Sequence, residues 1–376
     1  MKKIIIACDS FKGSLGSEEV GVAASEGVRM ADDTVETRVV AVADGGEGTV
    51  DALVRGLDGH YVSCTVGGPL GDPVGARYGI SGDGNTAIME MAQASGLTLI
   101  PECRRNPLYT STFGTGQMIA DALGRGCTTI LMGIGGSATN DGGMGLLSAL
   151  GVRFIDEGGS ELTPCGESLE KIAAIDLSGM DSRARTATFR IACDVDNPLY
   201  GPDGAACVFG PQKGADAEAV ERLDRGLRNY ARIVEKTTGR DVAAMPGAGA
   251  AGGLGVCFAA FFRSTLKPGI ELMLNAIRFD EIIAGADLII TGEGRLDTQT
   301  VHGKTPYGVL CAGRRQGIPV VAIGGAVTAY AELAAAGFRA VFPIVPGPCT
   351  LAEAMDAATA RRNVVNTVAQ IVRLFQ

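Results

Sequence analysis

Near-continuous apolar runs alternate with polar, glycine-containing segments along much of the chain. The runs KKIIIA and TRVVAVA predict buried strands, and each precedes a glycine-containing turn and a helical stretch. The same alternation returns at TTILMGI and, towards the C-terminus, in ADLIITGEG, IPVVAIGG and AVFPIVP. Parallel strands have such sequences because helices cover both faces of their sheet. We therefore expect an α/β fold with a doubly wound, mostly parallel sheet of the Rossmann or flavodoxin-like kind.

The alternation is interrupted between Tyr61 and Met91, where glycine, proline, aspartate and asparagine separate short apolar runs. The runs YVSCTV, ARYGI and TAIMEM in this stretch favour antiparallel hairpins. This change of pattern predicts a second α/β domain inserted into the first. We place the discontinuous, doubly wound domain at residues 1–58 and 284–376, and the inserted domain at residues 59–283.

Two further stretches carry apolar side chains at helical spacing and are assigned to packing. The first set comprises Val220, Leu223, Leu227, Tyr230 and Val234. The second set, near the C-terminus, comprises Leu351, Met355, Ala358, Val365, Val368, Val372 and Phe375. We expect both helices to bury these side chains in a core.

Composition narrows the class of protein. The chain has 376 residues, of which 46% are hydrophobic, and this size suggests about two domains with full cores. Apolar runs stay below the ~20 residues that span a bilayer, and the apolar stretch of MKKIIIAC is too short for a signal peptide. Ten cysteines without a CxxC pair indicate neither a zinc site nor a compact disulfide framework. We expect a reduced, cytoplasmic protein that does not engage a membrane.

The net charge of −9 disfavours a nucleic acid partner, because nucleic acid binding depends on clustered lysine and arginine. An anionic small molecule is still compatible with this charge, since local charge decides its binding. Several lysines lie in glycine- or proline-containing segments rather than in helical patterns. These candidate ligand contacts are Lys12, Lys213, Lys267 and Lys304.

The segment GIGGSATNDGG, residues 133–143, carries more glycine, hydroxyl and amide groups than a capped turn requires. It follows an apolar run and precedes the helical pattern MGLLSAL. A helix N-terminus presents unpaired N–H groups and the positive end of the helix dipole, so such a loop suits an anion. We expect Ser137, Thr139 and Asn140 to be its hydrogen-bonding groups.

A dinucleotide site is an alternative interpretation of the same loop. Gly133, Gly135 and Ala138 fit G-x-G-x-x-G/A after a strand, and Asp156 stands near the place of a ribose-binding acid. A second match, GAGAAG at 247–252, has no clear strand before it. In a chain with 55 glycines such matches arise by chance, and SATND places polar side chains where that turn carries little beyond glycine. An NAD-dependent dehydrogenase of a small hydroxy acid is therefore the weaker hypothesis.

The segment TQTVHGKT, residues 298–305, ends like a phosphate-binding P-loop. Thr298, however, occupies the place of the first required glycine, and Pro306 follows at once, so the motif is not a Walker A sequence. Phosphate contact by Lys304 needs only a cation and free N–H groups. A solvated loop lysine is the alternative.

Two aspartates lie close together in IACDVDNPLYGP. FRIACDV predicts a strand, which would direct the Asp194 and Asp196 side chains to one face, with a turn at Asn197 and Pro198. Paired acids at a strand end suit Mg²⁺ or a general base, and simple turn-forming aspartates are the alternative. With two histidines and no G-x-S-x-G motif, a hydrolase triad is not indicated. Carboxylates, lysines and backbone N–H groups are instead the components of phosphoryl transfer.

The chain also resembles the bacterial type I glycerate kinases, in segments that follow the order of that family and span nearly the whole sequence. These segments are DSFKGS (9–14), ADGGEGT (43–49), GGSATNDGG (135–143), CDVDNPLYGP (193–202), GPQKGA (210–215), AAGGLG (250–255) and TGEGRLDTQT (291–300). The resemblance implies ATP-dependent phosphorylation of D-glycerate, usually to 2-phosphoglycerate, by two α/β domains with the active site between them. Cys8 stands where a proline is expected and Gly16 where serine is commoner, and both flank the polar residues.

The candidate site residues lie in these segments and in the lysine-containing turns. The catalytic candidates are Asp194 as the base and the cations Lys12 and Lys304. The candidate substrate- or phosphate-binding residues are Ser10, Asp44, Glu47, Ser137, Thr139, Asn140, Asp141, Lys213, Gly253, Lys267, Glu293, Arg295 and Asp297. Asp194 and Asp196 are candidate magnesium ligands. We expect ATP and Mg²⁺ as cofactors and D-glycerate as substrate, with a homodimer left open and a non-catalytic organic-acid-binding protein as the remaining alternative.

Overall fold

The computed structural model of the chain describes residues 1–43, 45 and 48–376. The chain divides into two compact units, which we describe separately. Unit 1 comprises Met1–Leu57 and Pro268–Gln376, and unit 2 comprises Asp58–Lys267. The chain returns to unit 1 at Pro268, earlier than the expected position 284. It does so because α10 (Gly269–Ala276) packs against α2 (Thr49–Gly56) and α12 (Thr305–Arg315), which all belong to unit 1.

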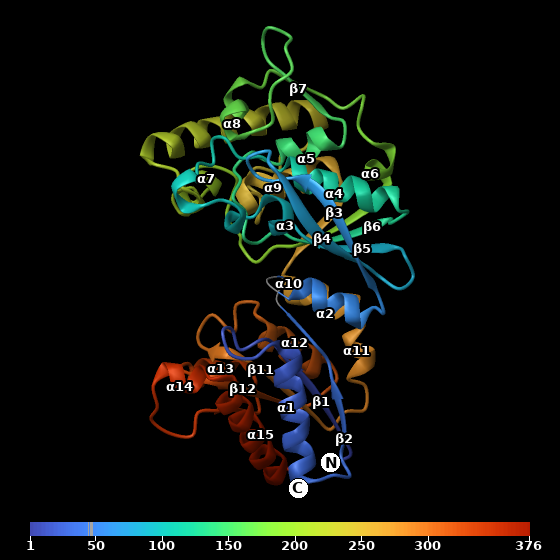
Figure 1. Cartoon of the computed structure of the whole chain (residues 1–376), viewed down its shortest axis with the longest axis vertical. Helices are drawn as coiled ribbons and strands as arrows, with labels where there is room; N and C mark the ends of the chain where they lie inside the picture. Colours follow the sequence, from blue (N-terminus) through green and yellow to red (C-terminus); the bar gives the residue numbers. More distant parts are fainter. Residues whose placement is uncertain (44, 46–47) are drawn as a thin grey trace. The chain divides into compact units, whose positions relative to one another are not determined.

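The sheet of unit 1 has the strand order β13-β12-β11-β1-β2, and neighbouring strands run parallel (Figure 1). Its strands are β1 (Lys3–Cys8), β2 (Glu36–Val39), β11 (Leu288–Leu296), β12 (Val320–Val327) and β13 (Ala340–Pro343). From β1 the chain first proceeds to β2 on one side, whereas the later strands extend from β11 on the other side. This order is the flavodoxin-like one, and its switch point lies between β1 and β11. The doubly wound sheet expected from the apolar runs is confirmed.

Helices cover both faces of this sheet. On one face, α1 (Ser17–Ala31) and α15 (Ala357–Leu374) lie side by side and share a core with Ile4 and Ile6 of β1. On the other face, α12 lies so close to β11 and β12 that a Cβ on its Gly313 would come within 3.2 Å of Ile289 Cδ1. The shorter helices of unit 1 are α11 (Phe279–Ile282), α13 (Tyr330–Ala336) and α14 (Leu351–Met355).

The sheet of unit 2 has the order β10-β9-β6-β5-β4-β3. Its strands are β3 (His60–Gly67), β4 (Pro73–Ile80), β5 (Thr86–Glu90), β6 (Thr129–Gly133), β9 (Thr188–Ala192) and β10 (Arg263–Lys267). The pairs β3–β4 and β4–β5 are antiparallel, as the short runs after Tyr61 predicted, and the remaining pairs are parallel. A separate antiparallel pair joins β7 (Arg153–Ile155) to β8 (Ala174–Asp176).

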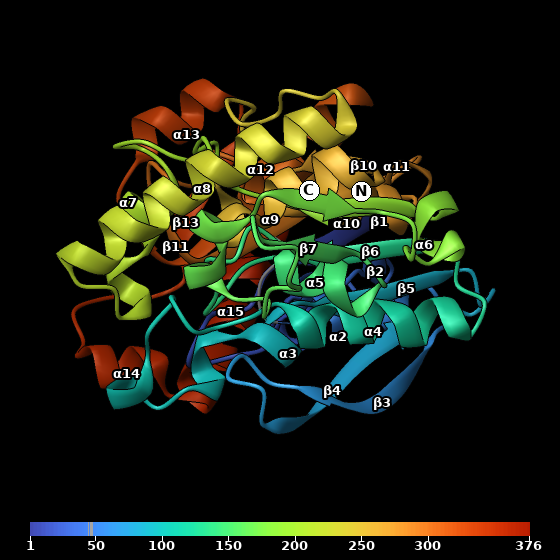
Figure 2. The same cartoon turned by 90° about the horizontal axis from the view of Figure 1, so that it is seen from above.

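The helices of unit 2 are mostly short. They are α3 (Ala92–Ser95), α4 (Phe113–Gly124), α5 (Met144–Ala149), α6 (Ser182–Thr186), α7 (Ala205–Phe209), α8 (Ala217–Thr238) and α9 (Ala250–Phe261), with 3₁₀ turns η1 (Leu97–Leu99), η2 (Glu102–Arg104), η3 (Gly166–Lys171) and η4 (Pro211–Lys213). Helices α4 and α5 lie side by side (Figure 2). In the described part of the chain, no helix combines the length and the apolar character that crossing a membrane requires.

Of the two stretches predicted to be packing helices, the first forms one helix with a buried face and the second does not. Asp216 caps the start of α8, where its carboxylate accepts from Ala219 N, and the helix buries Leu223, Leu227 and Tyr230 as expected. The C-terminal set does not form one buried face, because a break at Asp356 separates α14 from α15. Val365, Val368 and Val372 of the second set are buried, but Leu351, Met355 and Ala358 are exposed, so their assignment to a core was wrong.

Candidate functional site

The first candidate site lies at the switch point of unit 1. Asp9 directly follows β1, and its backbone N–H donates to Gly292 O of β11 at 2.8 Å. Ligands of doubly wound sheets bind at such a point, outside the carboxyl ends of the strands. Two pockets, of about 760 and 530 Å³, share the residues Asp9, Ser10, Lys12 and Ser14. The segment 9–14 therefore separates two hollows at the place where a ligand is expected.

An ionic cluster lines the smaller pocket. Lys304 Nζ lies 3.6 Å from Glu293 Oε2 and 3.7 Å from Asp297 Oδ1, and Arg295 Nε lies 3.4 Å from Asp297 Oδ2. Thr300 Oγ1 donates to Glu293 Oε1 at 2.7 Å. Burial raises the pKa of Glu293, although Thr300 and the charge of Lys304 act against the rise. The structure thus brings together the predicted residues Glu293, Arg295, Asp297 and Lys304.

The same cluster is joined to the end of β1. Lys304 is the N-cap residue of α12, as its predicted position at the start of a helix requires. The next residue, Thr305, donates from Oγ1 to Asp9 Oδ2 at 2.8 Å, and Ser10 N donates to Asp9 Oδ1 at 2.6 Å. The sequence pattern did not single out Asp9 or Thr305. Asp9 could have been found from its place directly after a buried strand.

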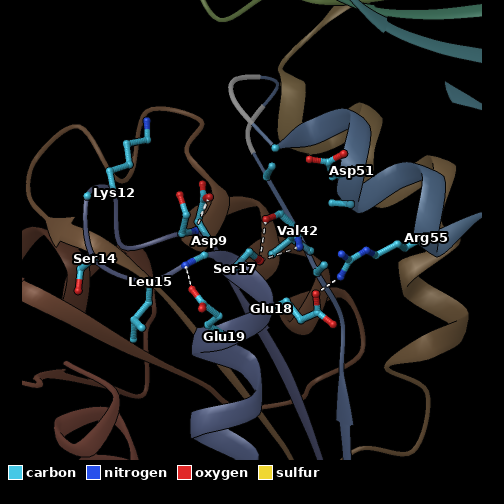
Figure 3. A pocket seen from close by; sticks show the side chains of 17 residues that line it. Asp9, Lys12, Ser14, Leu15, Ser17, Glu18, Glu19, Val42, Asp51 and Arg55 are labelled. Carbon is cyan, nitrogen blue, oxygen red and sulfur yellow. Dashed lines mark hydrogen bonds and ion pairs between the residues drawn. The ribbon is translucent and has the colours of Figure 1, made fainter. Parts of the chain in front are cut away.

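The larger pocket lies between the starts of α1 and α2 (Figure 3). Glu18 of α1 pairs with Arg55 of α2, and Ser17 Oγ donates to Cys8 O at 2.5 Å. In Figure 3, Lys12 stands on the opposite side of this pocket from Arg55. The predicted residues Asp44 and Glu47 lie outside the described residues.

The second candidate site is the loop between β6 and α5 in unit 2. Asp141 is fully buried there, and its carboxylate accepts from the backbone N–H groups of Gly143, Gly145 and Thr112 and from Thr112 Oγ1, at 2.8–3.2 Å. Burial raises the pKa of Asp141, and these hydrogen bonds oppose the rise. The N–H groups in the first turn of α5 that were expected to receive an external anion therefore already bind this carboxylate.

Lys213 supports this loop from the interior. The side chain is 2% exposed, and Nζ donates to Ser137 Oγ and to Thr139 O, each at 2.7 Å. Burial lowers the pKa of Lys213 to about 7, while the charge of Asp141 acts in the opposite direction. Lys213 was predicted to contact a ligand, whereas its observed contacts are with the loop itself.

The polar side chains of the loop are buried. Ser137, Thr139 and Asn140 are each less than a tenth exposed. Among the described residues, Thr139 Oγ1 and the side-chain amide of Asn140 have no hydrogen-bond partner. Such groups are costly to bury, and native structures rarely leave them without a partner or a function. Thr139 Oγ1 and the Asn140 amide are therefore the polar atoms of this loop whose lack of a partner calls for an explanation.

The predicted site residue Gly253 has a packing role next to the same loop. Gly252 and Gly253 have positive φ angles of 72° and 93°, and Gly142 N donates to Gly252 O at 3.0 Å. A Cβ on Gly253 would lie 3.0 Å from Gly142 Cα and 2.9 Å from Leu199 Cδ1. Glycine at this position thus allows one backbone to approach the other closely.

The remaining predicted residues of unit 2 follow the ends of parallel strands. Strand β9 ends at Ala192, so the prediction that Asp194 and Asp196 lie on one face of a strand was wrong. Backbone pairing with β10 reaches only Cys193, whose N–H donates to Lys267 O at 2.9 Å, and in the turn that follows Asn197 Nδ2 donates to Asp203 O. Asp194 and Asp196 are both exposed, as is Lys267, the last residue of β10. Within the described residues, no group of three or more His, Cys, Asp or Glu side chains could hold a metal ion.

The dinucleotide alternative lacks its ribose-binding acid. Asp156 follows β7, which belongs to the small antiparallel pair and not to the parallel sheet. Its Oδ1 accepts from Gly158 N and Ser160 N within its own turn, at 2.9 Å each. The second glycine match, at 247–252, leads into α9 from a turn instead of a strand. Neither match has the context that the dinucleotide fingerprint requires.

The switch-point pockets and the ionic cluster, at the carboxyl ends of parallel strands, are features of an α/β protein that binds a small charged ligand. Comparison with known proteins identifies the family, because the sequence profile of the glycerate kinase family matches residues 4–376. The chain belongs to the glycerate kinase family. The expectation of a glycerate kinase is confirmed, and neither the dehydrogenase nor the non-catalytic alternative gains support from the similar proteins.

The similar proteins match over almost their whole length. The chain is 49% identical to a glycerate kinase of Halalkalibacterium halodurans, covering 95% of this chain and 94% of that protein. It is 45% identical to the glycerate 2-kinase of Escherichia coli, with 98% of each chain covered. A crystal structure assigned as glycerate kinase 2 of Salmonella typhimurium LT2 superposes with a TM-score of 0.91 at 45% identity, covering 100% of this chain and 98% of that one.

Proposed function

We propose that the protein transfers the γ-phosphoryl group of ATP to D-glycerate and forms 2-phosphoglycerate. The observation that carries this proposal is the full-length match to the family, which includes a protein named glycerate 2-kinase. The ionic cluster at the switch point of unit 1 supports it, because a kinase must hold a polyanion at a fixed position. Positioning and charge neutralisation supply most of the rate of phosphoryl transfer.

The cations Lys12 and Lys304 are proposed to neutralise substrate charge. Lys12 is exposed beside both switch-point pockets, and Lys304 is the N-cap of α12. Glu293 and Asp297 hold Lys304 at 3.6 and 3.7 Å, so its ammonium group is positioned before a ligand arrives. A phosphate group would then meet a cation at the positive end of a helix dipole.

Asp194 is proposed to accept the proton of the glycerate hydroxyl. That hydroxyl has a pKa far above 7, so its proton must leave as the phosphoryl group arrives, and an aspartate is the usual acceptor in kinases. Asp194 is exposed just beyond the carboxyl end of β9, where a substrate can reach it. Its neighbours Asp196 and Asn197 offer further oxygen atoms.

Magnesium is proposed as the metal of the reaction. Mg²⁺ in kinases is held by one or two carboxylates together with the phosphates of the nucleotide, so a cage of three protein ligands is not needed. The exposed carboxylates of Asp194 and Asp196 fit this requirement, and Asp196 is the better candidate where Asp194 serves as the base. Bound there, the metal ion would neutralise charge on the transferred phosphoryl group.

The test is incubation of the protein with ATP, Mg²⁺ and D-glycerate, followed by phosphorus NMR of the product. We expect a 2-phosphoglycerate signal that depends on both ATP and Mg²⁺. A 3-phosphoglycerate signal would correct the position of transfer. Formation of NADH from glycerate without ATP would refute the kinase assignment, and tight glycerate binding without turnover would identify a binding protein instead.

A further inference from the structure

The smaller switch-point pocket has walls of opposite polarity. Lys12 and Lys304 belong to a wall of charged and polar side chains. The lining residues from the segment after β13 and from α14 are apolar, and they include Ile344, Val345, Leu351 and Met355. The volume of about 530 Å³ lies within the usual range for pockets that bind small molecules. Three acids, Asp9, Glu293 and Asp297, also line the pocket, and Lys12 and Lys304 are the lysines that a negatively charged group could approach. A ligand that matches this pocket therefore combines an apolar face with charged or polar groups.

Two side chains of the apolar wall, Leu351 and Met355, are exposed, whereas Ile344 is buried. Leu351 is 75% exposed and Met355 36%, which is costly for such side chains. Helix α14 nevertheless starts with a capping box, in which Thr350 N donates to Glu353 Oε2 at 2.8 Å and Glu353 N donates to Thr350 Oγ1 at 3.3 Å. The capping box stabilises the start of the helix that carries Leu351 and Met355, which are not part of the core of unit 1.

The two walls meet at the segment that carries Lys12. A Cβ built on Gly13 would lie 2.6 Å from Met355 Cε, so the methionine methyl group rests directly on the backbone beside Lys12. Gly13 also has a positive φ angle of 78°. A side chain at position 13 would thus be strained and would push Met355 away from the segment. This contact makes the apolar and the cationic surfaces parts of one pocket.

We propose that this pocket is the nucleoside subsite of the kinase. The purine base of the nucleoside triphosphate packs on Leu351 and Met355, and the phosphates extend towards Lys12 and Lys304. The proposal rests on the function proposed above. A purine nucleotide combines a flat ring of low polarity with a polyanion, which is the pair of properties that the two walls require.

The other substrate does not fit this pocket as well. Glycerate has three carbon atoms, each bearing oxygen, and therefore offers no apolar face for Leu351 and Met355. A purely apolar ligand would remove water from the ion pairs of Lys304 with Glu293 and Asp297 and would offer these groups no hydrogen bond in exchange. The position at the switch point between β1 and β11 also suits a nucleotide, since doubly wound sheets commonly bind nucleotides there.

The experiment measures nucleotide binding directly, without glycerate. Titration calorimetry in the presence of Mg²⁺ gives dissociation constants for ATP and for inorganic tripolyphosphate, which carries charge but no base. The test variants are Leu351→Gln and the double variant Leu351→Gln/Met355→Gln, which keep size and charge. The matched control is Leu374→Gln, because Leu374 is 73% exposed near the end of α15 and does not line the pocket.

We expect the double variant to weaken ATP binding by tenfold or more and to leave tripolyphosphate binding and the control variant unchanged. Unchanged ATP affinity in both test variants would overturn the proposal, as would an equal loss of ATP and tripolyphosphate binding. Unchanged ATP affinity with an altered oligomeric state would assign the apolar wall to contact between copies of the chain. Failure of glycerate phosphorylation in the wild-type protein would refute the proposed function while this binding result still stood.

Discussion

Replacing the buried Lys213 by methionine tests how the loop after β6 is supported. Two effects of Lys213→Met oppose each other at neutral pH. The variant loses the hydrogen bonds to Ser137 Oγ and Thr139 O, and each buried acceptor left without a donor costs about 1–3 kcal/mol. It also removes an ammonium group whose burial is costly, so the change in stability at a single pH is a small difference between large terms.

The pH dependence of stability separates these effects. Burial lowers the pKa of Lys213 from 10.5 in the unfolded chain to about 7 in the folded one. Below pH 7 both states carry the proton and the cost of burying the charge is constant. Between pH 7 and 10.5 the unfolded state binds more protons than the folded state, so the free energy of unfolding rises with pH. From pH 6.5 to pH 9 this rise amounts to roughly 2.5 kcal/mol.

The assay is urea denaturation of the wild type, Lys213→Met and the control Lys236→Met at both pH values. Lys236 is an exposed lysine in α8, so its replacement removes the same charge without relieving burial. We expect the wild type and the control to gain stability relative to Lys213→Met as the pH rises. A stability difference that does not change with pH, or that changes in the opposite direction, would show that Lys213 keeps its proton in the folded protein.

Three further predictions concern the proposed chemistry and the loop. Asp194→Asn keeps the shape but cannot accept a proton, so kcat should fall by ~10² or more with nearly intact nucleotide binding, and a retained kcat would place the base elsewhere. Lys12→Met and Lys304→Met should each raise KM or lower kcat by well over tenfold, because a charge-assisted contact contributes ~1.5–3 kcal/mol, whereas wild-type kinetics would make either lysine a surface residue. Asp141→Asn places an NH₂ group against backbone donors and should lower stability by about 3 kcal/mol in urea denaturation, and a loss below about 1 kcal/mol would contradict the role of its carboxylate.

The parallel strands were predictable because a strand buried on both faces has apolar residues at successive positions. Ile4, Ile5 and Ile6 are all fully buried, and an unbroken apolar run of this kind is typical of a strand that helices cover on both sides. The antiparallel hairpins were predictable from turn residues for the same local reason. The residue at which a strand ends was harder to predict. Asp194 and Val195 continue the alternation of polar and apolar residues in FRIAC, but strand β9 ends at Ala192 and a turn around Asn197 follows.

The sequence indicated where several polar residues of the candidate site lie along the chain, but not which of them are buried or what they contact. Asp297 and Lys304 could be found because they lie between a strand and a helix, and Glu293 because it is a polar residue towards the end of β11. Lys213 could not be recognised as buried, since its partners Ser137 and Thr139 lie far away in the sequence. Helical spacing likewise suggested a core role for Leu351, because periodicity reports which side chains share a face and not what covers that face.

The pairing of β1 with β11 has a consequence for the order in which the protein is made. Ile4 pairs with Leu288, so β1 leaves the ribosome long before its neighbour β11 has been synthesised. Unit 2 is continuous in sequence, from Asp58 to Lys267, and has a core of its own that can close earlier. Helix α1 completes its packing later still, because its partner α15 spans Ala357–Leu374 and is synthesised after β11. Contacts between such distant segments form slowly, so the unit whose synthesis starts first is the last to fold, and its apolar β1 needs protection from aggregation in the meantime.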